Sequence, residues 1–120
     1  MTYTIGIVGS RFFDQYELMK EKMNTLVDTH GPPTHIVSGG AKGADLLAER
    51  WAKENGYHMI VHPADWNKHG RRAGYLRNVK IVEDADRVVA FPSKTGRGTQ
   101  LTINLAAEKG IPVDIIGWEV

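Results

Sequence analysis

Strand-like and helix-like segments alternate along the whole chain, and this alternation is the feature that most limits its fold. Short β-rich runs near residues 3–8, 35–38, 57–62, 87–91 and 112–117 stop at or just before Gly, Ser or Pro. Between them lie four segments whose apolar residues recur at helical spacing. Strands that alternate with helices pair in parallel through right-handed crossovers. The sequence therefore predicts an α/β fold, a Rossmann-like three-layer sandwich with about five parallel strands and helices on both faces.

Three local signals refine this expectation. Asp14 and Glu17 have the spacing of a capping box at the start of the first predicted helix. Residues 63–70 are predicted as a loop, because Pro and Gly bound them. Thr99 is predicted as the N-cap of the last helix, because a Thr side chain can accept a hydrogen bond from an unpaired helical N–H group.

Composition narrows the class of protein. A chain of 120 residues is predicted to form one domain, residues 1–120. Lys and Arg number 15 and Asp and Glu number 14, and the net charge of +1 argues against a nucleic-acid coat or a polybasic membrane binder. The absence of Cys excludes disulfides, iron–sulfur clusters and thiolate zinc sites. No run approaches the roughly 18 apolar residues that span a bilayer, and no signal peptide is recognised. We therefore expect a soluble, cytoplasmic protein that does not bind membranes.

The loops that follow the strands are where a ligand is expected. In an open parallel sheet, ligands bind at the carboxyl ends of the strands, near the point where the strand order reverses. Three of the four loops are built from Gly, Ser, Thr and a cation, beginning with Gly9-Ser10-Arg11 after the first strand. If the strands are parallel, all four loops lie at one edge of the sheet.

The loop after the second strand has the clearest chemistry. It reads Ser38-Gly39-Gly40-Ala41-Lys42-Gly43-Ala44-Asp45 and leads directly into a predicted helix. Glycines let backbone N–H groups approach an anion, and the helix N-terminus and Lys42 add positive charge. The pattern is close to the dinucleotide fingerprint, although Ser38 stands at its first Gly and the Walker pattern is absent. A tight strand-to-helix turn without a ligand is the alternative.

The loop after the fourth strand repeats this arrangement. Gly96-Arg97-Gly98-Thr99 opens the last predicted helix, and Lys94 is nearby. An ordinary helix cap on a mobile loop is the alternative explanation. Two such loops at one edge favour a phosphorylated ligand more strongly than either loop alone.

A basic segment follows the third strand. It contains Lys68, His69, Arg71, Arg72, Arg77 and Lys80, with no acid between Asp65 and Glu83. Arg77-Asn78 places a planar bidentate donor beside an amide, which suits a phosphate or a base edge. Trp66 could stack on a nucleobase, although a lone Trp more often packs. For the charged segment as a whole, a solvated helix face is the alternative.

Asp14, Asp45 and Asp65 are the acids near these loops, and each also has a structural explanation. Asp14 fits a helix cap, Asp45 a first helical turn, and Asp65 the cap of a turn. Asp65 follows Gly43 by 22 residues, near where a dinucleotide fold places its ribose-binding acid. The five histidines lack the spacing of metal ligands, so no metal site is predicted.

These motifs, in this order, resemble the YspA/YpsA-related branch of the SLOG superfamily. The resemblance covers nearly the whole chain and rests on Gly9-Ser10-Arg11-x-Phe13-Asp14, Val37 to Asp45, Ala64-Asp65-Trp66, Gly70, Ala73-Gly74, Arg77-Asn78 and Gly96-x-Gly98-Thr99. The superfamily is described as Rossmann-like and as binding nucleotides or nucleotide-derived ligands, and some members of this branch are carried by bacteriophages. Relatives include LOG-type nucleoside 5′-monophosphate phosphoribohydrolases and the DprA DNA-processing proteins.

The departures from the LOG pattern bear on catalysis. The LOG Pro-Gly-Gly sequence is replaced here by Thr95-Gly96, preceded by Ser93 and Lys94. The position of the LOG catalytic Glu, three residues after Thr99, is Thr102. A hydroxyl group cannot serve as that carboxylate. The resemblance therefore implies nucleotide binding and puts LOG-like hydrolysis in doubt.

We therefore predict binding or sensing of a nucleotide or an NAD/ADP-ribose-type ligand, with no required cofactor and with a homo-oligomer as a further expectation. The alternatives are a LOG-like N-glycosidase that uses Asp14, Asp45 or Asp65, and DprA-like binding of single-stranded DNA through Lys68–Lys80. The predicted ligand-binding residues are Gly9, Ser10, Arg11, Ser38, Gly39, Gly40, Lys42, Gly43, Asp45, Asp65, Trp66, Arg77, Asn78, Gly96, Gly98 and Thr99.

Overall fold

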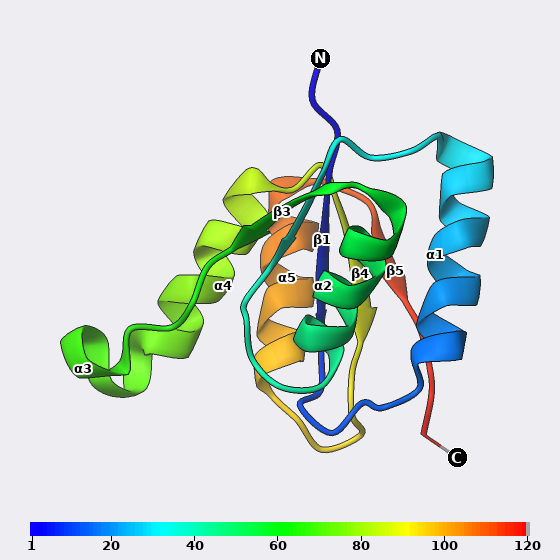
Figure 1. Ribbon diagram of the computed structural model, residues 1–120. Helices are drawn as coiled ribbons and strands as arrows, with labels where there is room; N and C mark the ends of the chain where they lie inside the picture. Colours follow the sequence, from blue (N-terminus) through cyan, green and yellow to red (C-terminus); the bar gives the residue numbers. More distant parts are fainter. Residues whose placement is uncertain (120) are drawn as a thin grey trace.

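The computed structural model describes residues 1–119 and contains a five-stranded sheet (Figure 1). Its strands are β1 (Thr4–Gly9), β2 (His35–Ser38), β3 (His58–Val61), β4 (Arg87–Phe91) and β5 (Val113–Ile115). The strands pair in parallel in the order β3-β2-β1-β4-β5. The predicted parallel sheet is confirmed, and its strand order reverses between β1 and β4.

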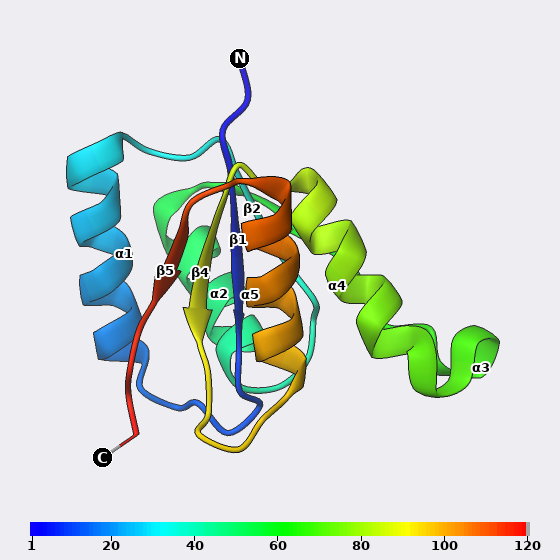
Figure 2. The ribbon, with the colours of Figure 1, turned by 180° about the vertical axis from the view of Figure 1, so that it is seen from behind.

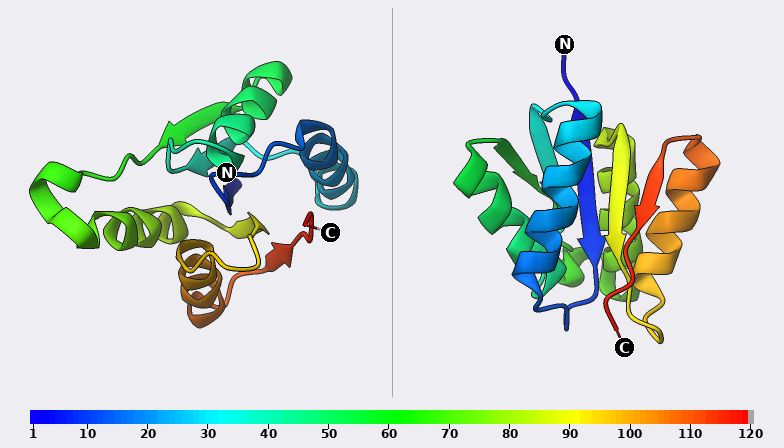
Figure 3. Two further views of the ribbon diagram at one scale, coloured as in Figure 1. Left: turned by 90° about the horizontal axis from the view of Figure 1, so that it is seen from below. Right: turned by 90° about the vertical axis from the view of Figure 1, so that its right-hand side faces the viewer.

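Helices cover both faces of the sheet (Figures 2 and 3). Helices α1 (Tyr16–His30) and α2 (Ala44–Asn55) lie on one face, and α4 (Ala73–Asp84) and α5 (Gly98–Lys109) lie on the other. A short helix, α3 (Trp66–His69), and one 3₁₀ turn, η1 (Gly70–Arg72), precede α4. A parallel sheet between two helical layers is the predicted Rossmann-like sandwich.

Alternate side chains of β1 divide the hydrophobic core into two clusters. Ile5 and Ile7 pack on the α1–α2 side with the fully buried Trp51. Val8 packs on the opposite side with Ile81 of α4. A strand that is buried on both faces reads as an almost continuous apolar run. This double burial explains why β1 lacks the polar alternation of a strand with one solvent-exposed face.

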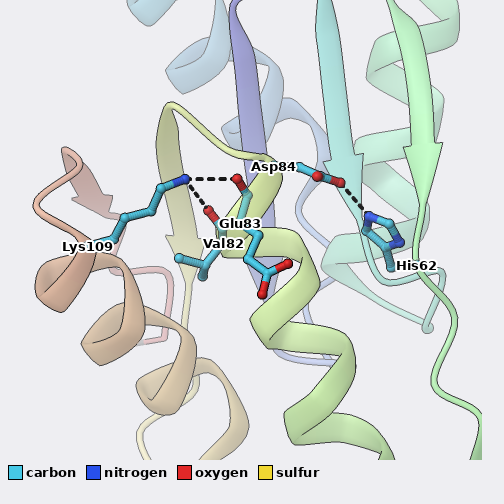
Figure 4. Close-up of polar contacts among 5 residues, drawn as sticks. All are labelled: His62, Val82, Glu83, Asp84 and Lys109. Carbon is cyan, nitrogen blue, oxygen red and sulfur yellow. Dashed lines mark hydrogen bonds and ion pairs between the residues drawn. The ribbon is translucent and has the colours of Figure 1, made fainter.

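The C-terminal end of α4 is tied to its neighbours, whereas its N-terminal end projects from the sheet. Lys109 Nζ donates to carbonyl groups at the tied end, including those of Val82 and Glu83 at 2.7 and 2.9 Å. His62 Nε2 lies 2.5 Å from Asp84 Oδ2 (Figure 4). A cation near the last carbonyls of a helix stabilises that end. The start of α4 and all of α3 extend away from the body (Figures 1 and 3).

The start of α1 differs from the sequence-based expectation. The helix begins after Gln15, and no side chain within residues 1–119 caps it. The capping box predicted at Asp14 and Glu17 is therefore not formed. The neighbouring Phe13 is buried in the core. This long-range packing, rather than a local cap, explains where the helix starts.

Two later boundaries also differ from the expectation. Residues 63–70, predicted as a loop, contain α3, because the Asp65 side chain accepts a hydrogen bond from the Lys68 N–H at 3.1 Å and caps this short helix. The last helix begins one residue before Thr99, so Arg97 stands at the N-cap and Thr99 lies in the first turn. The prediction of Thr99 as the cap is wrong by two positions.

Candidate functional site

A cavity of about 520 Å³ opens at the carboxyl edge of the sheet, between the ends of β1 and β4. The strand order reverses at this point, and open α/β sheets bind their ligands there. The cavity is lined by Val8, Gly9, Ser10, Arg11, Phe12, Ala41, Asp45, Trp66, Arg77, Asn78, Ile81, Ser93, Thr95, Gly96, Gly98, Thr99, Thr102, Trp118 and Glu119. The fold thus brings together most of the residues that the sequence singled out.

The N-terminus of α5 faces this cavity. Gly96, Gly98 and Thr99 all contribute to the wall. In the described part of the chain, no side chain caps α5, so the N–H groups of its first turn lack that partner. A Cβ built on Gly98 would meet no heavy atom within 4 Å, so the approach to this helix end is open. The exposed N–H groups and the helix dipole favour an anion here.

Arg77 is held at the cavity wall by two hydrogen bonds. Its Nη1 donates to the Gly39 carbonyl at 3.0 Å, and its Nε donates to Asn78 Oδ1 at 2.8 Å. Asn78 is buried, and its Nδ2 donates in turn to the Gly98 carbonyl at 3.4 Å. This chain of contacts links the guanidinium group, through Asn78, to the first residue of α5, and both line the same cavity. A full positive charge therefore reinforces the partial charge of the helix end.

The glycine-rich loop after β2 packs closely against Arg77 and the β1–α1 loop. A Cβ on Gly39 would stand 2.3 Å from Arg77 Nη1, so this glycine makes room for the guanidinium group. Gly43 has a φ of +75°, and a Cβ there would stand 2.4 Å from the Ser10 carbonyl oxygen. The same oxygen accepts the Ala44 N–H, the first of α2, at 3.1 Å. The β1–α1 loop therefore covers the N-terminus of α2.

Asp45 is the buried acid of the cavity lining, which also contains the exposed Glu119. The Asp45 side chain is buried, and its Oδ2 accepts the Ala41 N–H at 3.1 Å. Burial raises the pKa of the Asp45 carboxyl group above its ordinary value, while the Ala41 hydrogen bond and the Arg77 charge act in the opposite direction. The cavity thus holds a buried carboxyl group within the electrostatic reach of Arg77.

The β1–α1 loop is shaped by Gly9 and Ser10. A Cβ on Gly9 would stand 2.7 Å from the Phe91 carbonyl oxygen, so this glycine allows the two strand ends to approach. The Ser10 N–H donates to the same oxygen at 3.0 Å, and Ser10 Oγ accepts the Phe12 N–H at 3.0 Å. The guanidinium carbon of Arg11 lies 5.1 Å from the centre of the Phe12 ring. The loop therefore presents a cation and an aromatic ring to the cavity.

The C-terminal segment forms a wall that no sequence motif indicated. Trp118 Nε1 donates to the Phe91 carbonyl at 3.0 Å, and the Trp118 ring meets Phe13 edge-on. Glu119 Oε1 accepts the Lys94 N–H at 2.6 Å. These contacts depend on residues about 25 or more positions away in the sequence, so a local pattern could not reveal them.

Thr102 also lines the cavity. It is buried, and its Oγ1 donates to the Gly98 carbonyl at 3.2 Å. Thr102 occupies the position that the LOG pattern reserves for its catalytic Glu. A hydroxyl group committed to the first turn of α5 therefore stands where that pattern places a carboxylate.

Several predicted site residues lie outside the cavity lining. Asp65 caps α3, Lys42 is exposed, and the Ser38 hydroxyl is buried without a hydrogen-bond partner among the described residues. Asp14, a candidate catalytic acid, is exposed and also lies outside the lining. The other predicted residues outside the lining are Gly39, Gly40 and Gly43. A ligand-binding role for these residues stays a prediction.

Two further observations concern other classes of site. None of the helices within residues 1–119 is both long enough and apolar enough to cross a membrane. Over the same residues, no three His, Asp or Glu side chains come together as metal ligands would.

Sequence comparison relates the chain to a family and to a phage protein. The model of the YspA, cpYpsA-related SLOG family matches residues 4–69, which is more than half of the chain. The Gene 61 protein of Mycobacterium phage D29 is 43% identical over an alignment of 84 residues that covers 65% of this chain and 67% of that protein.

Structural comparison confirms the fold. DNA processing protein A (DprA) from Streptococcus pneumoniae superimposes with a TM-score of 0.80 at 22% sequence identity. The match covers 99% of this chain and 52% of the other, so this chain spans about half the length of that DprA chain. From the family match and the phage relative, the chain belongs to the YspA, cpYpsA-related SLOG family.

Proposed function

We propose that the protein binds, and by binding senses, a nucleotide or an NAD/ADP-ribose-type ligand in the cavity at the β1/β4 reversal. The observation that carries the proposal is the meeting of Arg77 and the uncapped start of α5 at one cavity. A phosphate group suits both, because it accepts charge-assisted hydrogen bonds from a guanidinium group and from helix N–H groups. Family membership supports the proposal, since SLOG domains typically bind nucleotide-derived ligands.

The rest of the cavity fits the remainder of such a ligand. A volume of about 520 Å³ lies within the range of roughly 300–1,000 Å³ that small-molecule sites occupy. Asp45 supplies carboxylate oxygens that can accept hydrogen bonds from ribose hydroxyl groups. Asp65, the other candidate for this role, caps α3 instead. We therefore assign the ribose contact to Asp45.

Isothermal titration calorimetry with AMP, GMP, ADP-ribose and NAD tests the proposal. A charge-assisted hydrogen bond contributes roughly 1.5–3 kcal/mol, so Arg77→Ala is expected to weaken binding about tenfold or more. Arg50→Ala is the control, because Arg50 is an exposed cation of α2 that lies outside the cavity lining. The proposal fails if no ligand of the panel binds, or if the control loses as much affinity as Arg77→Ala.

The same cavity favours binding over N-glycoside cleavage. Cleavage builds positive charge on the ribose, and a suitably placed carboxylate stabilises that charge. Thr102 cannot do so. We expect no release of free base from AMP, GMP or CMP when the products are separated by chromatography. Robust turnover that is abolished by Asp45→Asn or Asp65→Asn would favour the glycosidase function instead.

A second candidate function rests on the projecting segment. Lys68, His69, Arg71 and Arg72 are all exposed there, on a part of the chain that extends beyond the sheet (Figure 3). Clustered positive charge next to exposed aromatic rings suits single-stranded DNA. A labelled oligonucleotide whose affinity falls steeply as the salt concentration is raised would support this function. Such a salt dependence reports the counterions that the protein releases from the DNA backbone.

A further inference from the structure

Trp66 is a large apolar side chain that stays open to solvent at the cavity. Its exposed fraction is 60%, and it belongs to the cavity lining. It is the first residue of α3, on the projecting segment before α4 (Figure 1). Tryptophan side chains are highly buried on average. An indole exposed to this extent at a cavity therefore leaves a surface on which a flat ring can stack.

The indole ring rests on a defined support. A Cβ built on Gly74 would stand 3.4 Å from Trp66 Cη2, an ordinary van der Waals separation. The benzene part of the indole therefore lies against α4, at a residue that has no side chain to hold it away. The Asp65 side chain fixes the start of α3 by accepting the Lys68 N–H at 3.1 Å. The ring is thus positioned by the fold while most of its surface stays open.

The cavity lining combines two kinds of surface. Arg77, Asn78 and Thr102 contribute charged and polar groups near the start of α5. Trp66 and Phe12 contribute aromatic rings that are 60% and 70% exposed. A nucleotide has the same division, because its phosphate is an anion and its base has flat faces that stack on aromatic side chains.

We propose that Trp66 is the base-stacking residue of this cavity and that the ligand is a purine nucleotide. This inference rests on the proposed function, which places the phosphate at Arg77 and α5. A purine has two fused rings and overlaps an indole over a larger area than a pyrimidine does, so stacking on Trp66 selects purines. The phosphate contacts do not distinguish one base from another. The contribution of the phosphate and the contribution of stacking on Trp66 can therefore be measured separately.

The test compares AMP and GMP with ribose 5-phosphate by calorimetric titration. The purine nucleotide that binds better is expected to bind about tenfold or more tightly than ribose 5-phosphate, with UMP between them. Trp66→Ala is expected to bring its affinity close to that of ribose 5-phosphate, whose own binding stays unchanged. Trp66→Phe is expected to keep most of the difference. Tyr75→Ala is the matched control, because Tyr75 is an exposed aromatic residue of α4 outside the cavity lining.

Tryptophan fluorescence provides a second readout. Stacking of a purine is expected to quench Trp66 emission, and this quench is expected to disappear in Trp66→Phe. Trp51 is fully buried, whereas Trp118 is half-buried and also lines the cavity. The quench due to stacking on Trp66 is therefore the part that is lost in Trp66→Phe.

The outcomes separate this inference from the proposed function. If ribose 5-phosphate binds as tightly as the purine nucleotides, or if Trp66→Ala leaves purine affinity unchanged, the stacking role is wrong while the phosphate site stands. If neither ribose 5-phosphate nor any of AMP, GMP, ADP-ribose and NAD binds, the proposed function is wrong and the stacking role falls with it.

Discussion

The two glycine-rich loops at the carboxyl edge are alike in sequence and unlike in structure. Loop 39–43 leads into α2 and carries three glycines and Lys42, and loop 92–97 leads into α5 and carries Gly96, Lys94 and Arg97. In the first loop, the Ala41 N–H is bonded to Asp45, and α2 starts beneath a carbonyl group of the β1–α1 loop. Neither α2 nor α5 has a side-chain cap within residues 1–119. The difference is that the Ser10 carbonyl covers the first N–H of α2, whereas the start of α5 opens on the cavity without such a backbone cover.

This difference matters because N–H groups that already have partners within the protein are not free to bind an anion. Two glycines of loop 39–43 are required by packing. The absence of a side chain at Gly39 leaves room for the Arg77 guanidinium group, and its absence at Gly43 lets the Ser10 backbone approach. A Cβ on Gly98, by contrast, would meet no heavy atom within 4 Å. Loop 39–43 therefore contributes to the proposed phosphate site indirectly, by holding the guanidinium group of Arg77.

Gly43→Ala is expected to have the largest effect among substitutions that distinguish the loops. The positive φ strains any side-chain-bearing residue, and the added Cβ would press on the Ser10 backbone, which cannot move aside as a side chain can. Together these effects are expected to lower the free energy of unfolding by about 2–5 kcal/mol, as measured by urea denaturation.

Gly98→Ala is the matched control for this prediction. Its Cβ would meet nothing within 4 Å, and its backbone does not have a positive φ. Ala also favours helices over Gly, so the free energy of unfolding is expected to change by less than about 1 kcal/mol. Equal destabilisation by the two substitutions would contradict the division into a packed loop and an open one.

Gly39→Ala is expected to weaken ligand binding more than it weakens the fold. The new Cβ would stand 2.3 Å from Arg77 Nη1, at the end of a flexible side chain that can move. The guanidinium group would leave the Gly39 carbonyl, so AMP affinity measured by calorimetry is expected to fall about tenfold. Adding Arg77→Ala should then cost little more, because both changes remove the same contact. Full additivity would mean that Gly39 acts independently of Arg77.

Asp45→Asn is expected to give the smallest effect and a pH-dependent one. Burial raises the pKa of Asp45 in the folded protein above its ordinary value of 3.8, so folding favours the protonated form. The folded protein is therefore most stable, with respect to this group, at a pH below the pKa that Asp45 has in the unfolded chain. It loses stability as the pH rises through the pKa of Asp45 in the folded protein, because the buried carboxyl group must then ionise. Asn does not ionise, so the variant does not lose this stability. Relative to the natural protein, the variant should therefore gain more stability at pH 7 than at pH 4, and a difference independent of pH would contradict this.

The fold was predictable because its signals are local and repeated. Strands covered on both faces produce the apolar runs that end at Gly and Pro, and the predicted run 3–8 corresponds to Thr4–Gly9 in the structure. The prediction failed where a long-range contact replaced a local one. Phe13 is buried just before α1, and the pair Asp14 and Glu17 does not cap the helix.

The cavity was predictable in part. Residue chemistry pointed to Arg77 and Asn78 and to the start of α5, and all of these line the cavity. The close packing of loop 39–43 was not predictable, because it depends on a hydrogen bond between Ala44 and the distant Ser10. Trp118 and Glu119 were missed for the same reason, since tertiary contacts alone bring them to the site.

Backbone amide NMR during a titration with AMP tests the central claim most directly. The claim is that phosphate binds at the start of α5 and that the start of α2 is already occupied by the protein itself. The amide signals of Gly98 and Thr99 are predicted to shift most, while that of Ala44 stays nearly unchanged. Ala41 is not diagnostic, because its N–H is bonded to Asp45, the proposed ribose contact. A large shift at Ala44 with none at Gly98 and Thr99 would contradict the account and move the phosphate site to loop 39–43.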